Sequence, residues 1–346
     1  MKPLIVPFFI SHRGCPHQCV FCDQRTITGR RGELPSPDEI RSTIARYAAT
    51  GRGRLIEVAF YGGSFTSLPR SVQDGLLQPL QLLLATGEVT SVRLSTRPDA
   101  VDGETAPFLR DRGVATIELG VQSMDDRVLA LAGRGHGAAE TERAFALLGD
   151  AGIAVGGQLM PGLPGDTPEL AMASLHRLLA LRPASLRIYP TVVIEGTPLA
   201  DLWRRGEFDP FDVETAVSLC AAMLRACAAA GVPVVRVGLQ PTEELLAPGT
   251  VLAGPWHPAF RQLVEGELWF ELLLRLTTGL AVGSSVELVG PSSRVSDLVG
   301  QGRRNLRRLE EQRGVRVSKV ASDHAAAPHT LAVTRPDGIA TGTLFG

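Results

Sequence analysis

The stretch Ser11-His12-Arg13-Gly14-Cys15-Pro16-His17-Gln18-Cys19-Val20-Phe21-Cys22 carries three cysteines in a C-x3-C-x2-C pattern, directly after the apolar segment 3–10. Three closely spaced thiolates can bind three irons of a cubane cluster and leave the fourth iron without a protein ligand. A zinc site is the alternative, but zinc usually needs a further Cys or His pair, and none follows in the sequence. The pattern therefore favours a [4Fe–4S] cluster held by Cys15, Cys19 and Cys22.

The open iron of such a cluster can chelate the amino and carboxylate groups of S-adenosylmethionine (SAM). An electron from the cluster would then break the sulfonium C–S bond and give a 5′-deoxyadenosyl radical. The aromatic ring of Phe21, beside the last cysteine, could pack on the adenine. This chemistry also requires a one-electron donor, such as a flavodoxin or a ferredoxin.

Short β-rich runs alternate with helical patterns from residue 1 to about 235, which is typical of parallel strands joined by crossover helices. The expected strands are 3–10, 55–61, 91–96, 115–120, 153–160, 184–190 and 232–237. Helical spacing is clear at 36–50 and 137–150. We expect an α/β fold, a partial TIM-type (β/α) barrel, with its chemistry at the carboxyl ends of the strands.

The bulk composition is that of an ordinary globular protein with no general attraction to polyanions. Apolar residues make up 44%, charged residues 21%, and the net charge is −1. A nucleic-acid site would therefore have to be local. No apolar stretch is long enough for a membrane span, and residues 1–10 predict a strand and not a signal peptide. Five cysteines without a disulfide pattern fit a reducing cytoplasm.

The second predicted strand ends in Tyr61-Gly62-Gly63-Ser64-Phe65. Paired glycines at a strand end allow a ligand to approach the backbone closely, which suits the methionyl part of SAM. Gly62 and Gly63 are therefore candidate cofactor residues. The hydroxyl of Ser64 is a candidate contact for the SAM amino group.

Other strand ends carry polar groups that a purely structural barrel would not need. Arg97, after Thr96, could bind the SAM carboxylate, and Glu118 could bind the ribose hydroxyls. The alternative is a salt bridge of Arg97 with Asp99 or Glu118. Further candidate cofactor contacts are Thr96, Gln122, Gln158 and Arg134. His136, in the same loop as Arg134, is expected at the surface.

With these motifs in view, the chain resembles the radical SAM portion of the Elongator catalytic-subunit family, which modifies wobble uridines in transfer RNA. The resemblance covers about residues 1–235 and includes Gly-Gly-Ser-Phe, Ser-Thr-Arg-Pro-Asp and Glu-Leu-Gly-Val-Gln-Ser. Its most specific part is the string Leu-Arg-Ile-Tyr-Pro-Thr-Val-Val-Ile-Glu-Gly-Thr at 186–197. A weaker similarity links the chain to oxygen-independent coproporphyrinogen oxidases.

Two differences from that family limit what the resemblance implies. Ser64 stands where radical SAM enzymes often have Glu after the glycines. No segment of the 346 residues resembles the family's acetyltransferase domain, so we do not carry over its acetyl-coenzyme A chemistry. The substrate side of the cavity has four candidate catalytic residues, Tyr189, Glu195, Gln240 and His257.

The sequence after about residue 283 predicts a small α+β domain of βααβ type. Its strands are expected at 284–290, 315–320 and 329–334, and its helices at 292–299 and 303–313. The string at 299–306 resembles the I-G-x-x-G-x-x-I loop of KH domains, which clamps single-stranded nucleotides. The resemblance implies RNA contacts from Gly300, Gln301, Gly302, Arg303, Arg304 and Arg307. A domain that merely closes the barrel is the alternative.

We therefore expect a radical SAM partial barrel at 1–237, a connecting helical region at 238–282 and a KH-like domain at 283–346. The preferred function is RNA modification, with transfer RNA as the expected partner. A radical enzyme for a small molecule such as a tetrapyrrole or a coenzyme is the second hypothesis. A noncatalytic iron–sulfur protein that binds RNA is the third.

Overall fold

A computed structural model describes residues 3–10, 12–16, 18–28, 34–51 and 53–346. The chain forms two compact units. The barrel unit comprises residues 1–212 and 232–256, and the C-terminal unit comprises residues 213–231 and 257–346. Helix α10 (Val213–Ala229), which we expected in the barrel domain, is grouped with the C-terminal unit because it packs on α12 (Phe260–Leu276).

Seven parallel strands form the sheet of the barrel unit in the order β1-β2-β3-β4-β5-β6-β8, within the described residues. They are β1 (Leu4–Phe9), β2 (Ile56–Tyr61), β3 (Ser91–Thr96), β4 (Val114–Gln122), β5 (Ala154–Leu159), β6 (Ser185–Ile188) and β8 (Val234–Val237). Each coincides with a strand expected from the sequence. The predicted α/β half-barrel is confirmed.

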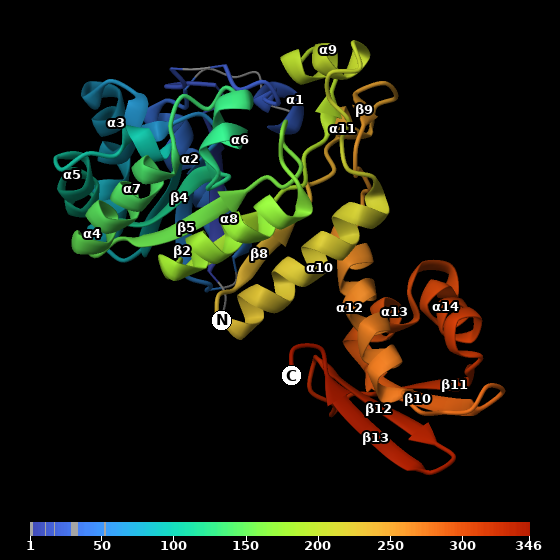
Figure 1. The fold of residues 1–346 in the computed structure, drawn as a ribbon. Helices are drawn as coiled ribbons and strands as arrows, with labels where there is room; N and C mark the ends of the chain where they lie inside the picture. Colours follow the sequence, from blue (N-terminus) through green and yellow to red (C-terminus); the bar gives the residue numbers. More distant parts are fainter. Residues whose placement is uncertain (1–2, 11, 17, 29–33, 52) are drawn as a thin grey trace. The chain divides into compact units, whose positions relative to one another are not determined.

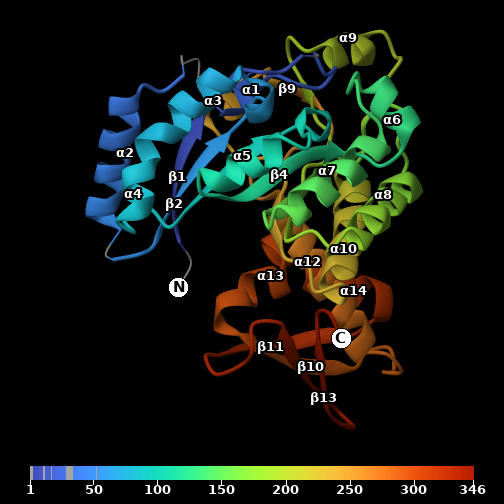
Figure 2. The same cartoon turned by 90° about the vertical axis from the view of Figure 1, so that its left-hand side faces the viewer.

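Helices follow the strands along the chain and cover the outer face of the sheet, as Figures 1 and 2 show. They include α2 (Pro37–Thr50), α3 (Arg70–Leu77), α4 (Gln81–Ala85), α5 (Thr105–Asp111), α6 (Asp126–Leu131), α7 (Ala138–Asp150) and α8 (Pro168–Ala180). Helix α2 begins at Ser36 with a capping box, in which Ser36 and Glu39 satisfy each other's backbone N–H groups.

Successive strand residues point to opposite faces of the sheet. In this sheet apolar residues occupy the outer face and polar residues the inner face. Val58, Leu94 and Ile117 are fully buried under the outer helices. Their neighbours in sequence, Glu57 and Glu118 among them, point into the half-barrel. The inner face is therefore the polar one, which is unusual for a small barrel core and marks it as the place for a ligand.

Short elements complete the barrel unit near the carboxyl ends of its strands. They are α1 (Gln24–Thr28), α9 (Pro198–Arg204), α11 (Glu243–Leu246) and the antiparallel pair β7 (Val193–Ile194) and β9 (Val251–Ala253). No helix in the described residues is long and apolar enough to span a membrane.

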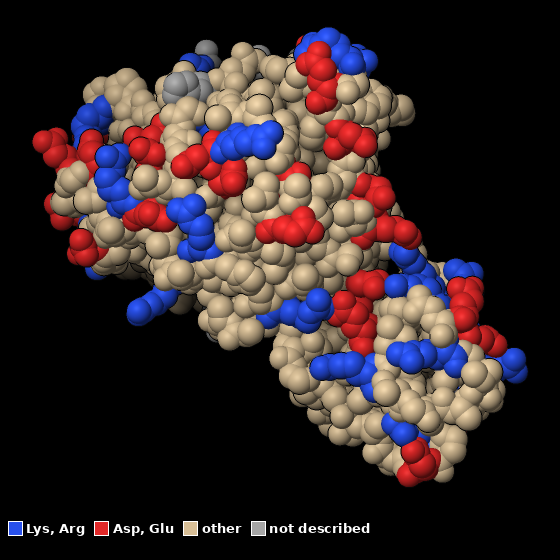
Figure 3. Space-filling view, viewed as in Figure 1, with Lys and Arg blue, Asp and Glu red and all other residues tan. Residues whose placement is uncertain are grey.

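The C-terminal unit contains the expected β-α-α-β succession: β10 (Ser285–Pro291), α13 (Val295–Val299), α14 (Arg304–Arg313) and β11 (Arg316–Asp323). Strands β12 (Thr330–Arg335) and β13 (Gly338–Thr343) complete a sheet in the order β11-β10-β12-β13. Strand β13 was not predicted from the sequence. Figure 3 shows positive and negative side chains interspersed on the face that it presents.

Candidate active site

A cavity of about 720 Å³ lies inside the half-barrel. Most of the residues singled out in the sequence line it, and all of these belong to the barrel unit. They are Cys15, Cys19, Phe21, Cys22, Gly62, Gly63, Thr96, Arg97, Glu118, Gln122, Arg134, Gln158, Tyr189 and Gln240. Three of the candidates for cofactor or substrate contact, Ser64, Glu195 and His257, do not line it.

The cysteine loop is held against the glycine motif by direct backbone packing. The N–H of Ser64 donates to the carbonyl of Arg13 at 2.8 Å. A Cβ on Gly63 would lie 2.4 Å from that carbonyl oxygen, and one on Gly14 would lie 2.3 Å from the carbonyl oxygen of Ser64. Both glycines have positive φ. Gly14 and Gly63 are required because the backbones of the two segments touch at this point. This packing requirement is separate from the contact with SAM that the sequence predicts.

Gln24 joins the same two segments through its side chain. Its Oε1 accepts hydrogen bonds from the N–H groups of His12 and Gly63, each at 2.6 Å. Its own N–H donates to Nε2 of His12 at 2.9 Å. Gln24 could not be predicted from the sequence, since a glutamine two residues after a cysteine carries no recognisable signal.

The three thiols converge at one end of the cavity. Burial, followed by the proximity of Cys19 and Cys15, raises the pKa of Cys22 to about 12. Burial and Cys19 likewise raise the pKa of Cys15. Cys19 is buried and Cys15 and Cys22 are half-buried, and thiols gathered in this way are suited to a group that supplies positive charge, as cluster irons do.

Arg134 supplies further positive charge to this end, since its Nη1 donates to Sγ of Cys19 at 3.2 Å. Within the described residues, no three His, Cys, Asp or Glu side chains gather closely enough to surround one metal ion. A cubane cluster does not need three ligands around one ion, because each thiolate binds a different iron. The three cysteine thiols therefore fit a [4Fe–4S] cluster.

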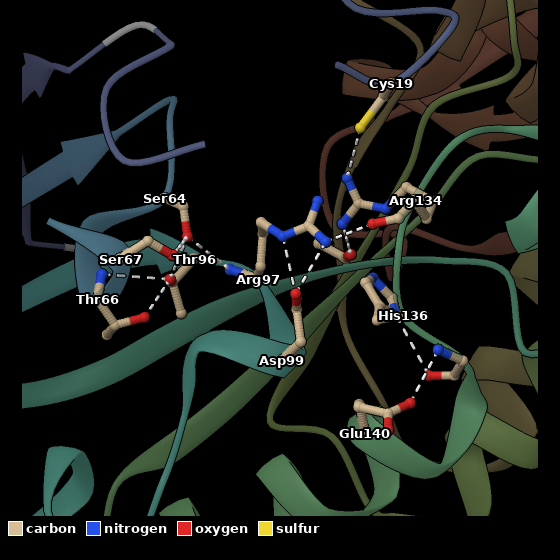
Figure 4. A network of polar contacts seen from close by, with 12 residues as sticks. Cys19, Ser64, Thr66, Ser67, Thr96, Arg97, Asp99, Arg134, His136 and Glu140 are labelled. Atoms are coloured by element: carbon tan, nitrogen blue, oxygen red, sulfur yellow. Dashed lines mark hydrogen bonds and ion pairs between the residues drawn. The ribbon is translucent and has the colours of Figure 1, made fainter. Parts of the chain in front are cut away.

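Two buried guanidinium groups, those of Arg97 and Arg134, lie on the same side of the site as Cys19 (Figure 4). Arg97 is 3% exposed, and its Nε and Nη2 each donate to the Asp99 carboxylate at 3.0 Å. Its Nη2 also contacts the carbonyl oxygen of Arg134. The salt bridge considered as an alternative for Arg97 is therefore present.

That salt bridge leaves part of both guanidinium groups unsatisfied. Nη1 of Arg97 and Nε of Arg134 are buried without a hydrogen-bond partner among the described residues. A buried donor left unpaired costs about 1–3 kcal/mol. An anionic ligand in the cavity would remove this cost, so Arg97 fits both the salt bridge and the predicted SAM carboxylate contact.

His136 was expected at the surface, and this expectation is wrong. Its side chain is buried, 8% exposed, and lies near that of Arg134 (Figure 4). Burial, and then the charge of Arg134, lowers the pKa of His136 to about 4. The imidazole is therefore neutral at neutral pH. The sequence string Gly-Arg-Gly-His gave no sign of this burial.

Ser64 lies behind the cavity wall. Its Oγ is within hydrogen-bonding distance of Thr96 Oγ1 at 3.0 Å and of Ser67 Oγ at 2.9 Å. Thr96 itself lines the cavity. In this arrangement Ser64 positions Thr96.

Glu118 is engaged by two arginines of the polar inner face. Its Oε1 accepts from Nη1 of Arg93 at 2.9 Å and from Nη2 of Arg187 at 2.8 Å. Its Oε2 accepts from Nε of Arg187 at 2.7 Å. Arg93 also reaches Glu57 at 3.2 Å. Glu57, Arg93, Glu118 and Arg187 thus form a network of four charges. It uses both carboxylate oxygens of Glu118, the residue predicted from the sequence to bind the ribose.

Gln122 and Gln158 meet across the next strands, with Nε2 of Gln158 3.4 Å from Oε1 of Gln122. Gln122 has a φ of +67° at an irregularity in the pairing of β4 with β5. A positive φ on a non-glycine residue is costly and often accompanies a functional site. Both glutamines line the cavity, where a ligand can reach them.

The four residues proposed for the substrate side separate into two pairs. Tyr189 lines the cavity, where its hydroxyl is 3.3 Å from Nη1 of Arg187, and Gln240 also lines it. Glu195 instead pairs with Arg204 and is about half exposed. His257 belongs to the C-terminal unit, where its Nδ1 accepts from the N–H of Ala259 before α12.

The predicted RNA-binding loop lies between α13 and α14. Gln301, Gly302, Arg303 and Arg307 are exposed, and no ion pair reaches either of these two arginines within the described residues. Arg304 instead pairs with Glu214 of α10 at 2.9 Å.

Two side chains on α14 have structural roles. Asn305 holds the loop through its Nδ2, which donates to the carbonyl of Gly266 at 2.8 Å and to that of Leu298 at 3.0 Å. Gly300 has a φ of +74° and a ψ of 159°, a conformation that is essentially restricted to glycine, and a Cβ there would also lie 3.0 Å from the Asn305 side chain. Arg308 pairs with Glu267 and lies over the Phe270 ring.

Comparison with known proteins agrees with this fold and site. The model of the radical SAM superfamily matches residues 9–178, and that of the Radical_SAM C-terminal domain matches residues 183–269. The chain belongs to the radical SAM superfamily. Its members use a [4Fe–4S] cluster and SAM, so the predicted enzyme class and both cofactors are confirmed at the level of the family.

Within the superfamily the chain is similar to Elongator-type proteins. It is 30% identical over 255 residues to the tRNA uridine(34) acetyltransferase of Methanocaldococcus infernus, covering 62% of this chain and 48% of that protein. It is 27% identical over 263 residues to Elongator complex protein 3 of Saccharomyces cerevisiae, covering 62% and 46%. The chain thus spans about half the length of these relatives.

A solved structure shows the same fold. The archaeal Methanocaldococcus infernus Elp3 with an N-terminal deletion superimposes with a TM-score of 0.61 at 22% identity. The match covers 80% of this chain and 67% of that one. The predicted resemblance to the Elongator family is confirmed.

Proposed function

We propose that this chain modifies RNA, with transfer RNA as the substrate, by radical SAM chemistry in the cavity of the barrel unit. The observation that carries the chemistry is the convergence of three thiols beside two buried guanidinium groups with unsatisfied N–H donors. Two observations favour RNA. Arg303 in the KH-like loop and Arg307 on the helix that follows it are exposed and unpaired among the described residues, and the names of the relatives refer to transfer RNA or to Elongator.

Cys15, Cys19 and Cys22, which line the cavity, would hold the cluster. The bound cluster would supply the electron for reductive cleavage of SAM to methionine and a 5′-deoxyadenosyl radical. Arg97 and Arg134 would bind the carboxylate of SAM through Nη1 and Nε, the atoms left unpaired in the protein. Thr96, Gln122 and Gln158 lie where they can hydrogen-bond the rest of that molecule.

The proposal also includes a cellular setting and a redox partner. All five cysteines are free thiols, which fits the reducing cytoplasm. We propose that a flavodoxin or a ferredoxin there delivers the electron.

The RNA part is tested by charge reversal in the loop. Arg303→Glu with Arg307→Glu should weaken binding of a transfer RNA by roughly tenfold or more and reduce the salt dependence of its affinity, because two phosphate contacts are lost. The matched control is Arg41→Glu with Arg46→Glu on the exposed face of α2, which changes the net charge equally. Equal effects of the two double variants on affinity, measured across a salt series, would contradict the assignment of this loop.

A further inference from the structure

The cavity continues past the cofactor residues along the inner face of the sheet. Ile5, Pro7 and Phe9, which alternate along β1, all line it. At the other edge of the sheet Arg236 of β8 lines it (β8 in Figure 1). None of these four residues has a role in the site described above.

Arg236 differs from the other arginines of the cavity. Arg97 pairs with Asp99, Arg187 with Glu118, and Arg134 donates to the Gly120 carbonyl at 2.5 Å. For Arg236 the described residues provide no hydrogen bond or ion pair.

The position of Arg236 makes this unpaired charge costly. Arg236 is aligned with Arg187 across the parallel pairing of β6 and β8. Like charges at directly opposed positions of neighbouring strands destabilise a sheet. Both oxygens of Glu118 are already used by Arg93 and Arg187. An anion that enters the cavity would therefore be attracted to Arg236 in particular.

An aromatic pair lines the same cavity. Phe9 and Tyr61 are directly paired across β1 and β2, with ring centroids 6.2 Å apart. Both rings are partly exposed. The guanidinium of Arg187 lies 5.4 Å from the Tyr61 ring centroid, and burial raises the pKa of the Tyr61 hydroxyl. Tyr61 is therefore a neutral, planar surface on which a ring can stack.

We propose that these residues form the subsite for one nucleotide of the substrate, whose base stacks on Phe9 and Tyr61 and whose phosphate binds Arg236. Stacking on an aromatic ring is sequence-tolerant, and a guanidinium matches the phosphate oxygens. The target nucleotide would have to leave its stack to reach the cavity, as in other enzymes that act on a base. This inference rests on the proposed RNA substrate and adds the residues that receive it.

The subsite is tested by comparing uridine 5′-monophosphate with uridine as ligands of the holoenzyme, reconstituted without oxygen and saturated with S-adenosylhomocysteine. Wild type should bind the nucleotide roughly 10- to 100-fold more tightly, the usual range for a charge-assisted hydrogen bond. In Arg236→Gln this ratio should fall to near one. Arg143→Gln, a change of an exposed arginine on α7, should leave the ratio unchanged.

The aromatic pair is tested separately with Phe9→Leu. Loss of stacking should weaken the nucleoside and the nucleotide equally, by roughly tenfold, and should leave their affinity ratio as in wild type. Unchanged binding of S-adenosylhomocysteine by both variants shows that each is folded. A wild-type ratio in Arg236→Gln, or nucleoside affinity unchanged in Phe9→Leu, would overturn the subsite.

Failure of the subsite can be told from failure of the proposed function. RNA-stimulated SAM cleavage by wild type, together with an unaltered ratio in Arg236→Gln, would refute the subsite and keep the RNA substrate. A ratio that depends on Arg236, without any stimulation by RNA, would support the subsite and refute RNA as the substrate.

Discussion

Gly63→Ala is expected to prevent assembly of the iron–sulfur cluster. The new Cβ would lie 2.4 Å from the carbonyl oxygen of Arg13 and 2.5 Å from that of Ile10, both of them backbone atoms. Neither can move without shifting the loop that carries Cys15 and Cys19. The residue also has a φ of +59°, which alanine adopts only at a cost of about 1 kcal/mol. The measurement is iron and sulfide bound per chain after anaerobic reconstitution.

The control for this variant is Gly53→Ala. Gly53 has a φ of +75°, and a Cβ there would meet nothing within 4 Å. It therefore adds the same kind of backbone strain without the collision. We expect the control to bind a full cluster and Gly63→Ala to bind less than a tenth of that amount. Equal cluster content would contradict the packing of the glycine motif on the cysteine loop.

Glu118→Ala is expected to lower the stability of the barrel unit by about 3 kcal/mol. The carboxylate is 7% exposed and joins Arg93 to Arg187. Breaking a buried ion pair by removing one partner costs about 3–5 kcal/mol, because the other charge stays behind unpaired. We expect the lower end of this range because Arg93 keeps its ion pair with Glu57 in the variant. The melting temperature of the cluster-free protein should fall by roughly 6–12 °C.

A surface pair provides the matched comparison. Glu207 makes two hydrogen bonds to Arg205, at 2.7 and 3.0 Å, but both side chains are exposed. Glu207→Ala should leave the melting temperature unchanged, since exposed ion pairs contribute little. If Glu118→Ala melted like wild type and lost only SAM affinity, its carboxylate would be a ribose ligand and not the centre of the charge network.

The sequence allowed prediction of the elements whose signals are local. The cysteine spacing, the Gly62-Gly63 pair and the alternation of strands with capped helices such as α2 all place chemistry at the strand ends of an α/β half-barrel. The loop at Gly300 was likewise recognisable from its two glycines between helical patterns.

Interactions between distant segments could not be predicted in this way. Gln24 acts through two backbone N–H groups, His136 is buried by the surrounding fold, and Arg236 matters because its neighbour on β6 is another arginine. Glu118 forms ion pairs because Arg93 and Arg187 point toward it from nearby strands. Strand β13 was missed because Gly338–Thr343 contains two glycines and few apolar residues.

The central claim is tested most directly by 5′-deoxyadenosine formation from SAM, using anaerobically reconstituted, reduced protein with and without transfer RNA. The account predicts formation by wild type that rises with RNA, and none by Cys19→Ala. Formation that is indifferent to RNA would favour a small-molecule substrate. An absence of 5′-deoxyadenosine from wild type with an intact cluster would contradict the account.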